Sequence, residues 1–132
     1  MPVSWRIERA AGLVVLTSDR EASFDEWSGA LNAAAGAPGW RAGLRVLHDC
    51  RALERVPSSA EAQSRGLFVA RRAKSLGIER WAAVVPEDIS KRETYWLAAI
   101  YADRGSVWCR TFTNIEEAKA WLQAPTNGKV LM

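Results

Sequence analysis

The run His48-Asp49-Cys50 is the one place in the sequence where residue types suited to catalysis stand together. An imidazole base beside a thiol can generate a reactive thiolate, so His48 and Cys50 together suit nucleophilic catalysis. Neighbouring strand residues point to opposite faces, which puts His48 and Cys50 on one side and Asp49 on the other. The simpler interpretation is a structural histidine at a strand end, with Asp49 held by the following loop or by Arg51. We therefore expect a protein that is not an enzyme and has no catalytic residue.

The sequence shows no phosphate-binding or metal-binding motif. It contains no GxGxxG or GxxxxGK pattern for phosphates, and its single histidine and two cysteines show no CxxC spacing. The acidic pairs Glu87-Asp88 and Glu116-Glu117 each open a predicted helix, where carboxylates interact favourably with the helix dipole. We expect no cofactor and no metal.

Two adjacent serines, Ser58 and Ser59, precede a long stretch with helical spacing. Either hydroxyl can accept hydrogen bonds from the unpaired amides of a first helical turn, so the simplest role for them is a helix cap. A phosphate added at this position would lie at a helix N-terminus, which stabilises anions. Ser58 and Ser59 are therefore candidates for phosphorylation as well as for capping.

The helix that follows these serines has a predicted partner surface. Small and apolar residues recur along it at steps of four and three, which predicts one buried seam: Ala62, Gly66, Val69, Ala73 and Leu76. On a helical wheel we place Phe68 on the opposite side, among Arg65, Arg71 and Arg72. An exposed aromatic ringed by arginines has the composition of an interface hot spot. The alternative is that Phe68 packs under the loop 51–57.

Composition indicates one globular domain. The chain has 132 residues, of which 48% are apolar and 25% charged, and its net charge of +3 only weakly favours anionic partners. Its seven tryptophans are best explained by packing. The start of the chain lacks the apolar core of a signal peptide, and we expect a cytoplasmic protein with no membrane insertion. The predicted domain covers 1–124, and 125–132 form a short flexible tail.

Periodicity and capping patterns predict the element order ββαβαβαβα. The predicted strands lie at 3–8, 13–17, 44–48, 81–85 and 107–112. The predicted helices begin at Ser23, at Ser58 or Ser59, at Pro86 and at Asn114.

This order predicts a mixed, mostly parallel five-stranded sheet in sequence order, with the first strand antiparallel and at an edge. Because crossovers between parallel strands are right-handed, we expect a single layer of helices on one face of that sheet. Cys50 and Cys109 then fall on strands separated by one further strand, ~10 Å apart. That distance is too long for a disulfide.

Three stretches of the chain resemble a known family. They are Trp40–Arg51, Ala82–Asp88 and Val107–Leu122, which contain Gly-Leu-Arg-Val-Leu before Asp-Cys-Arg, Ala-Val-Val-Pro, and Glu-Ala-Lys-Ala-Trp-Leu. Together with the element order they resemble the STAS domain of anti-sigma-factor antagonists, and most of all its uncharacterised SpoIIAA-like bacterial relatives. The resemblance implies a non-enzymatic regulatory role. It also places the family's phosphorylatable Asp-Ser-Ser-Gly stretch at 57–60, where this chain has Pro-Ser-Ser-Ala.

Three classes of function follow from the sequence. We favour a protein-interaction module that binds another protein or a second copy of itself, and we expect no nucleic-acid partner. The first alternative is a binder of a small apolar or lipid-like ligand on the sheet or helix surface. The second is an enzyme that uses His48 and Cys50.

Overall fold

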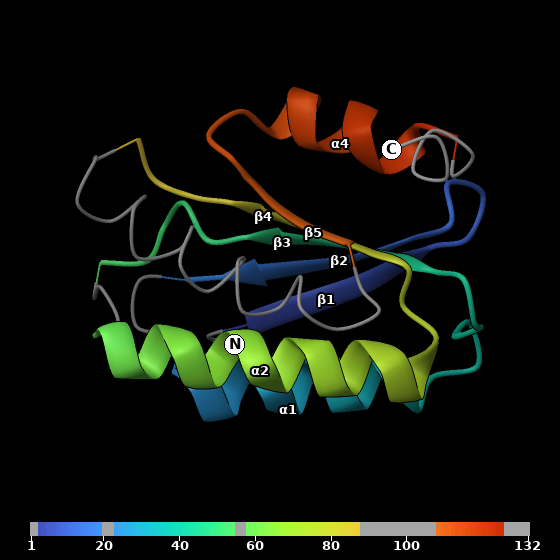
Figure 1. Cartoon of the computed structure of the whole chain (residues 1–132). Helices are drawn as coiled ribbons and strands as arrows, with labels where there is room; N and C mark the ends of the chain where they lie inside the picture. The colour runs from blue at the N-terminus through green and yellow to red at the C-terminus, as the bar shows by residue number, and fades with distance from the viewer. Residues whose placement is uncertain (1–2, 20–22, 55–57, 88–107, 126–132) are drawn as a thin grey trace.

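The computed structural model of the chain describes residues 3–19, 23–54, 58–87 and 108–125 (Figure 1). Its strands are β1 (Val3–Glu8), β2 (Leu13–Ser18), β3 (Arg45–Asp49), β4 (Arg80–Val84) and β5 (Trp108–Phe112). Its described helices are α1 (Phe24–Ala35), α2 (Ser59–Leu76) and α4 (Ile115–Gln123). The predicted helix after Pro86 and the predicted tail lie, apart from their first residues, outside the described part of the chain.

The five strands form one sheet in the order β1-β2-β3-β4-β5, which confirms the predicted topology. β1 pairs antiparallel with β2 across the turn at Gly12, whose φ of 67° favours glycine. The pairs β2–β3, β3–β4 and β4–β5 are all parallel. The α/β class, the mixed sheet and the antiparallel first strand are therefore as the sequence predicted.

Local sequence signals fix the helix ends. Ser23 and Ser58 each accept a hydrogen bond from the backbone amide three residues on, and the glutamate at that position bonds back to the serine amide. These are two complete capping boxes. α2 ends at Gly77, whose φ is 72° and whose missing side chain lets Ala42 approach. A β-carbon at Gly77 would come within 2.8 Å of the Ala42 β-carbon, so glycine is required here on two grounds.

The helices lie on both faces of the sheet, and the prediction of a single layer is wrong for α4 (Figure 1). α1 and α2 share one face, as right-handed crossovers require. α4 packs on the other face over β3, β4 and β5. Because α4 follows the last strand, no crossover rule fixes its side. The sheet is apolar on its second face as well, and α4 covers that face with Ala118 and Leu122.

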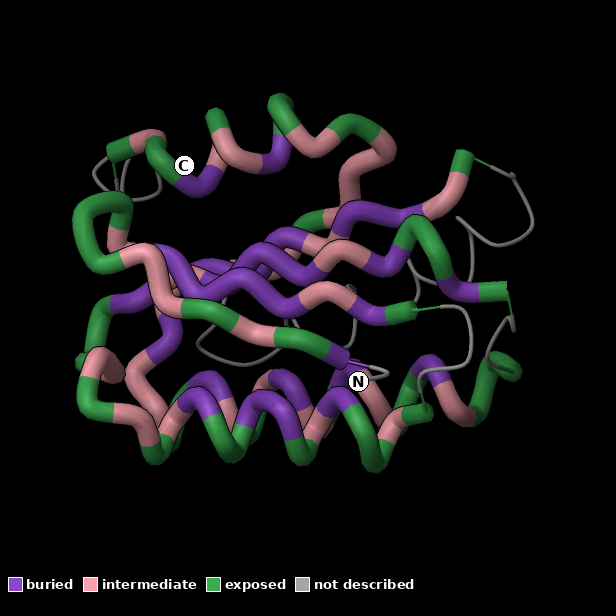
Figure 2. Tube along the Cα trace, turned by 180° about the vertical axis from the view of Figure 1, so that it is seen from behind, coloured by how far each residue is buried: buried purple, intermediate pink, exposed green. Residues whose placement is uncertain are grey.

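Two apolar cores result, one on each face, and the central strands β2, β3 and β4 between them are mostly buried (Figure 2). The larger core joins β1–β4 to α1 and α2 and includes Trp27, Leu31 and Trp81. The smaller core joins the sheet to α4 and has these buried members: Leu13, Val15, Leu47, Ala82, Val84, Ala118 and Leu122.

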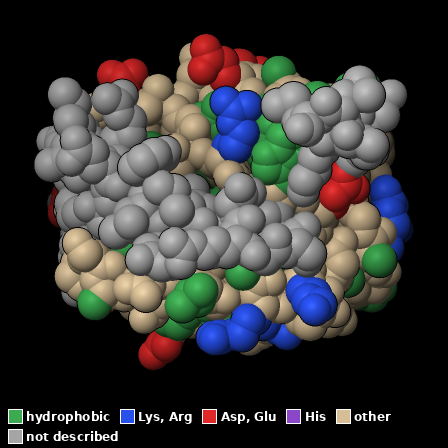
Figure 3. Space-filling model, in the orientation of Figure 1, with side chains coloured by type: hydrophobic (Ala, Val, Ile, Leu, Met, Phe, Trp, Pro, Cys, Tyr) green, Lys and Arg blue, Asp and Glu red, His purple; other side chains and the backbone are tan. Residues whose placement is uncertain are grey.

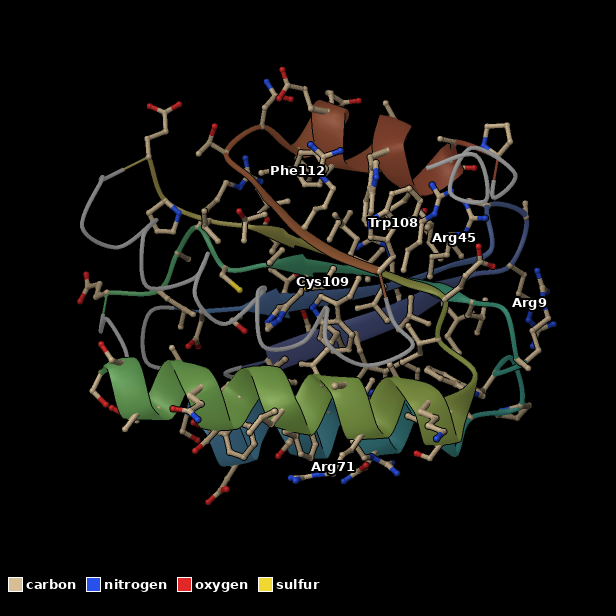
Figure 4. The ribbon with its side chains drawn as sticks, viewed as in Figure 1. Arg9, Arg45, Arg71, Trp108, Cys109 and Phe112 are labelled. Atoms are coloured by element: carbon tan, nitrogen blue, oxygen red, sulfur yellow. The ribbon has the colours of Figure 1, made fainter. Side chains whose placement is uncertain are left out.

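Two arginines from the starts of β3 and β4 hold the end of α4. Arg80 is 1% exposed and donates to the carbonyls of Trp121 at 2.5 Å and Pro125 at 2.9 Å. Arg45 donates to the carbonyls of Leu122 and Ala124. These cations satisfy carbonyls that a helix C-terminus leaves unpaired, and they oppose its negative dipole end. Figure 4 shows Arg45 between the sheet and the end of α4.

Candidate functional site

The carboxyl edge of the parallel strands gathers most of the residues that the sequence singled out. β2 and β3 end there at Ser18 and Asp49, and α1 and α2 begin nearby at their capping serines, Ser23 and Ser58. In open α/β sheets, ligands and partners commonly bind outside this edge. The structure therefore brings the His48 region and the start of α2 to the same end of the molecule.

His48 is a buried core residue. It is 6% exposed, and its Nε2 lies 2.9 Å from the Ser18 hydroxyl oxygen. The rings of Trp27 and Trp81 flank the imidazole, with centroids 5.4 Å and 6.2 Å away. Burial lowers the pKa of His48 to about 4, and nearby Arg65 contributes in the same direction while Asp49 opposes it. At neutral pH His48 is therefore an uncharged imidazole whose Nε2 is already paired with Ser18.

The Cys50 side chain packs against different residues from those that surround the His48 ring. It is 3% exposed and packs with Leu53 and Val85, and its thiol contacts the backbone carbonyl of His48 at 3.9 Å. Burial, with a smaller contribution from Asp49, raises the pKa of the Cys50 thiol. A reactive thiolate is disfavoured by this environment. No disulfide joins Cys50 to Cys109.

Asp49 has the role that the simpler interpretation gave it. Its carboxylate accepts three hydrogen bonds from Arg51, one from the backbone amide and two from the guanidinium, at 2.9–3.1 Å. Although burial opposes the charge, these bonds lower the pKa of Asp49. Asp49 therefore closes the turn after β3 and lies away from the His48 ring.

Ser58 and Ser59 lie at the start of α2, and both are exposed. Ser58 is the cap, because its hydroxyl accepts from the Glu61 amide at 3.2 Å while the Glu61 carboxylate accepts from the Ser58 amide at 3.1 Å. Ser59 is the first residue of the helix. The two serines thus divide the predicted roles: one hydroxyl caps the helix, and both are open to solvent.

Beside this cap a hollow of about 230 Å³ opens between the starts of α1 and α2. Its lining residues are Phe24, Ala60, Glu61, Ser64 and Arg65. The guanidinium of Arg65 lies over the Phe24 ring, 5.8 Å from its centroid, and 4.0 Å from the Glu61 carboxylate. The hollow is therefore walled by an aromatic ring and rimmed by one cation and one carboxylate.

An aromatic cluster lies behind the hollow. Phe24, Trp27 and Phe68 contact one another edge to face, with ring centroids 5.1–5.6 Å apart. Trp27 in turn contacts Trp81 and His48, so the cluster extends from the surface to the centre of the larger core. Because Trp27 is buried, the Phe24 end of the cluster is the part that meets the hollow.

Phe68 does not occupy the position that the helical wheel gave it. It is half-buried and packs against α1, whereas we expected it to point away from the seam. Phe68 precedes Val69 and so lies only about 100° from the seam, on the flank that faces α1. The exposed apolar residue on α2 is its neighbour Leu67, at 37%.

The three arginines of the predicted surface also have different surroundings. Arg65 is half-buried at the hollow, and Arg72 is half-buried and donates to the Asn32 side chain at 2.6 Å. Arg71 is exposed, and Figure 4 shows it on the side of α2 that points away from the sheet. The predicted set therefore divides between the hollow, the α1–α2 contact and the outer surface.

A second hollow, of about 290 Å³, lies at the carboxyl end of β5. It is lined by Val85, Arg110, Thr111, Phe112, Thr113 and Glu117. Arg110 stacks over the rings of Phe112 and Trp121, at 5.2 Å and 5.7 Å. Sequence reasoning missed this hollow and the contribution of Phe24 to the first one. The available signal for Phe24 was its place directly after the capping serine.

The residues that the structure describes contain no group of three or more histidine, cysteine, aspartate or glutamate side chains able to hold a metal ion. Within the same residues no helix is long and apolar enough to cross a membrane. Comparison of the chain with protein-family models, curated proteins and solved structures finds no match. The resemblance to STAS and SpoIIAA-like proteins therefore remains a prediction from the sequence.

Proposed function

We propose that this protein is a non-enzymatic regulatory module that binds another protein through the starts of α1 and α2. The observation that carries the proposal is the hollow beside Phe24, where an aromatic cluster continuous with the core reaches the surface under Arg65. Aromatic residues and arginine around a small pocket are the usual composition of an interface hot spot. The resemblance to STAS antagonists supports partner binding at this same end of the molecule, since it aligns their switch serine with Ser58 and Ser59.

The surroundings of His48 and Cys50 support a binding role over a catalytic one. His48 is neutral and hydrogen-bonded to Ser18, and burial stabilises Cys50 as the thiol. A nucleophile and its base need side chains in contact with each other and with a substrate. The contacts of these two side chains are with the core.

The size of the hollow favours a protein side chain over a lipid-like ligand. Pockets for small molecules commonly have ~300–1,000 Å³ and enclose most of the ligand. The hollow at Phe24 has about 230 Å³ and is shallow, which suits one bulky side chain from a partner. A small apolar ligand is the alternative function, and we expect it to bind more weakly here than a protein.

Phosphorylation of Ser58 or Ser59 would regulate such a surface. The phosphate would lie at the α2 N-terminus, which favours an anion, and next to the Glu61 carboxylate, which opposes it. The two serines precede Ser64 and Arg65 of the hollow by five to seven residues, roughly one and a half to two helical turns. A modified serine would therefore change the charge that an incoming partner meets.

Affinity capture with hollow-filling variants tests the proposal. Ser64→Trp places a large ring in the hollow from an exposed position, and Lys119→Trp places the same ring on α4 as a control. We expect one protein, or a second copy of this chain, to be enriched by wild type and by Lys119→Trp and to be lost with Ser64→Trp. Equal capture by all three proteins, at equal melting temperature, would contradict the proposal. Native mass spectrometry of the same samples detects a bound lipid.

A further inference from the structure

The outward side of α2 carries one exposed ridge whose chemistry changes along its length. Exposed residues recur along it at steps of four and three: Ala60, Ser64, Leu67, Arg71 and Lys74. At 1.5 Å per residue the ridge spans ~21 Å, about four helical turns. Its first half is small or apolar and its second half is basic. Figure 3 shows a hydrophobic patch beside lysine and arginine side chains on this part of the surface.

The apolar half of the ridge is continuous with the hollow. Ala60 and Ser64 line the hollow, and Leu67 follows Ser64 by three positions on the same side of the helix. Leu67 is the exposed large hydrophobic residue of the described chain, with 37% of its surface accessible. A partner that fills the hollow would therefore meet a second apolar contact about one turn further along α2.

The basic half of the ridge presents two positively charged side chains, Arg71 and Lys74, to solvent. Arg65 and Arg72 are engaged by Glu61 and Asn32, within the chain itself. Arg71 and Lys74 are exposed and form no hydrogen bond or ion pair with any residue that the structure describes. These two cations, about one and two turns beyond Leu67, complement carboxylates on a partner.

We infer that α2 binds an acidic amphipathic helix of the partner protein. One apolar side chain of that helix enters the hollow, a second contacts Leu67, and its carboxylates lie over Arg71 and Lys74. Apolar anchors one turn apart and a ridge four turns long match the spacing of a helix lying along α2. The inference rests on the proposed function and adds the chemistry of the partner to it.

A nucleic acid or an anionic membrane fits this surface less well. Both would favour basic residues along the whole ridge, whereas its first half lies beside the Glu61 carboxylate and includes no cation of its own. Neither ligand accounts for the apolar hollow. The change from apolar to basic along one ridge is the feature that selects an amphipathic protein segment.

Binding of designed peptides tests the inference. The probe is an 18-residue fluorescein-labelled helix with leucines on one face and three glutamates at one end. Two analogues carry glutamine or lysine in place of glutamate. Anisotropy titrations measure their affinity for wild type, Leu67→Ser, Arg71→Glu/Lys74→Glu and the control Lys119→Glu on α4. Chemical-shift mapping locates the contact on the protein.

We expect the glutamate peptide to bind wild type and Lys119→Glu equally, and Leu67→Ser and the double variant at least ~10-fold more weakly. Shift changes should follow the ridge from Ser64 to Lys74. No binding by the glutamate peptide, or equal binding by the lysine analogue, overturns the inference. Equal binding by the glutamine analogue overturns the acidic partner while leaving the proposed function standing, because Ser64→Trp capture tests that function separately. Binding to phosphatidylserine vesicles that needs Arg71 and Lys74 but not Leu67, without peptide binding, assigns the ridge to membranes instead.

Discussion

The two faces of the sheet are covered in different ways. On one face two long helices, α1 and α2, pack over an aromatic core. His48 lies against this core and is uncharged at neutral pH. On the other face the nine-residue α4 covers a smaller core, and two arginines hold its last carbonyls. A wide apolar interface needs no such charged contacts, whereas a short helix gains stability from specific ones at its end. We therefore expect the α1–α2 face to be the more stable side and α4 to open locally.

Of the substitutions that probe the two faces, the removal of Trp27 should lower the free energy of unfolding most. Trp27 is 5% exposed and its ring contacts four other aromatic rings, so Trp27→Ala leaves a large cavity in the bigger core. We expect a loss of about 4 kcal/mol in the free energy of unfolding, measured by urea denaturation. α1, α2 and the strands that they cover should lose hydrogen-exchange protection together. A loss confined to α1 would contradict cooperative unfolding of the larger core.

Removing Arg80 should act on the other face and act locally. Arg80→Ala removes the side-chain donor to the carbonyls of Trp121 and Pro125, so that the Trp121 carbonyl keeps only the Ala124 amide. It also removes the guanidinium stacked on Trp108 and Trp121. We expect about 3 kcal/mol less protection of the α4 amides in hydrogen exchange, with smaller changes in α1 and α2. Arg110→Ala is the matched control: it removes an exposed guanidinium that stacks on Trp121 of the same helix, whereas the hydrogen bonds to the Trp121 and Pro125 carbonyls come from Arg80, so it should lower protection much less. Equal loss in all helices would show that the two faces unfold as one.

Acid should destabilise the α1–α2 face through His48. Its pKa is about 4 in the folded protein and 6.5 in an unfolded chain, so the unfolded state binds the proton more readily. The stabilisation is complete above pH 6.5 and is lost as the pH falls through 6.5 toward 4. We expect about 2 kcal/mol less stability at pH 5 than at pH 7. His48→Phe should remove most of this difference, and a variant that keeps it would show that another group titrates.

Loss of the α2 cap should have the smallest effect. Ser58→Ala removes the acceptor of the Glu61 amide and should cost about 1 kcal/mol in thermal or urea unfolding. Ser58→Asp keeps an acceptor at the same position and should restore most of the loss. If both variants are equally unstable, the cap is not the reason for the serine.

The sequence predicted the sheet because each strand carries its own pattern and the crossover rule orders them. It could not predict the side of α4, because nothing in the topology constrains a helix after the last strand. The pairing of Ser18 with His48 spans thirty positions and has no local signal. Phe68 was misplaced for a related reason: a wheel of α2 shows the seam facing the sheet and contains no information about α1.

The most direct test of the partner surface compares the two faces in living cells. A photo-cross-linking amino acid at position 64 lies at the hollow, and the same amino acid at position 119 lies on α4. We predict a discrete protein adduct, with another protein or a second copy of this chain, from position 64 and none from position 119. The adduct from position 64 should disappear when Phe24 is changed to Ser in the same chain. Equal adducts from both positions, or an adduct from position 119 alone, would contradict binding through the starts of α1 and α2.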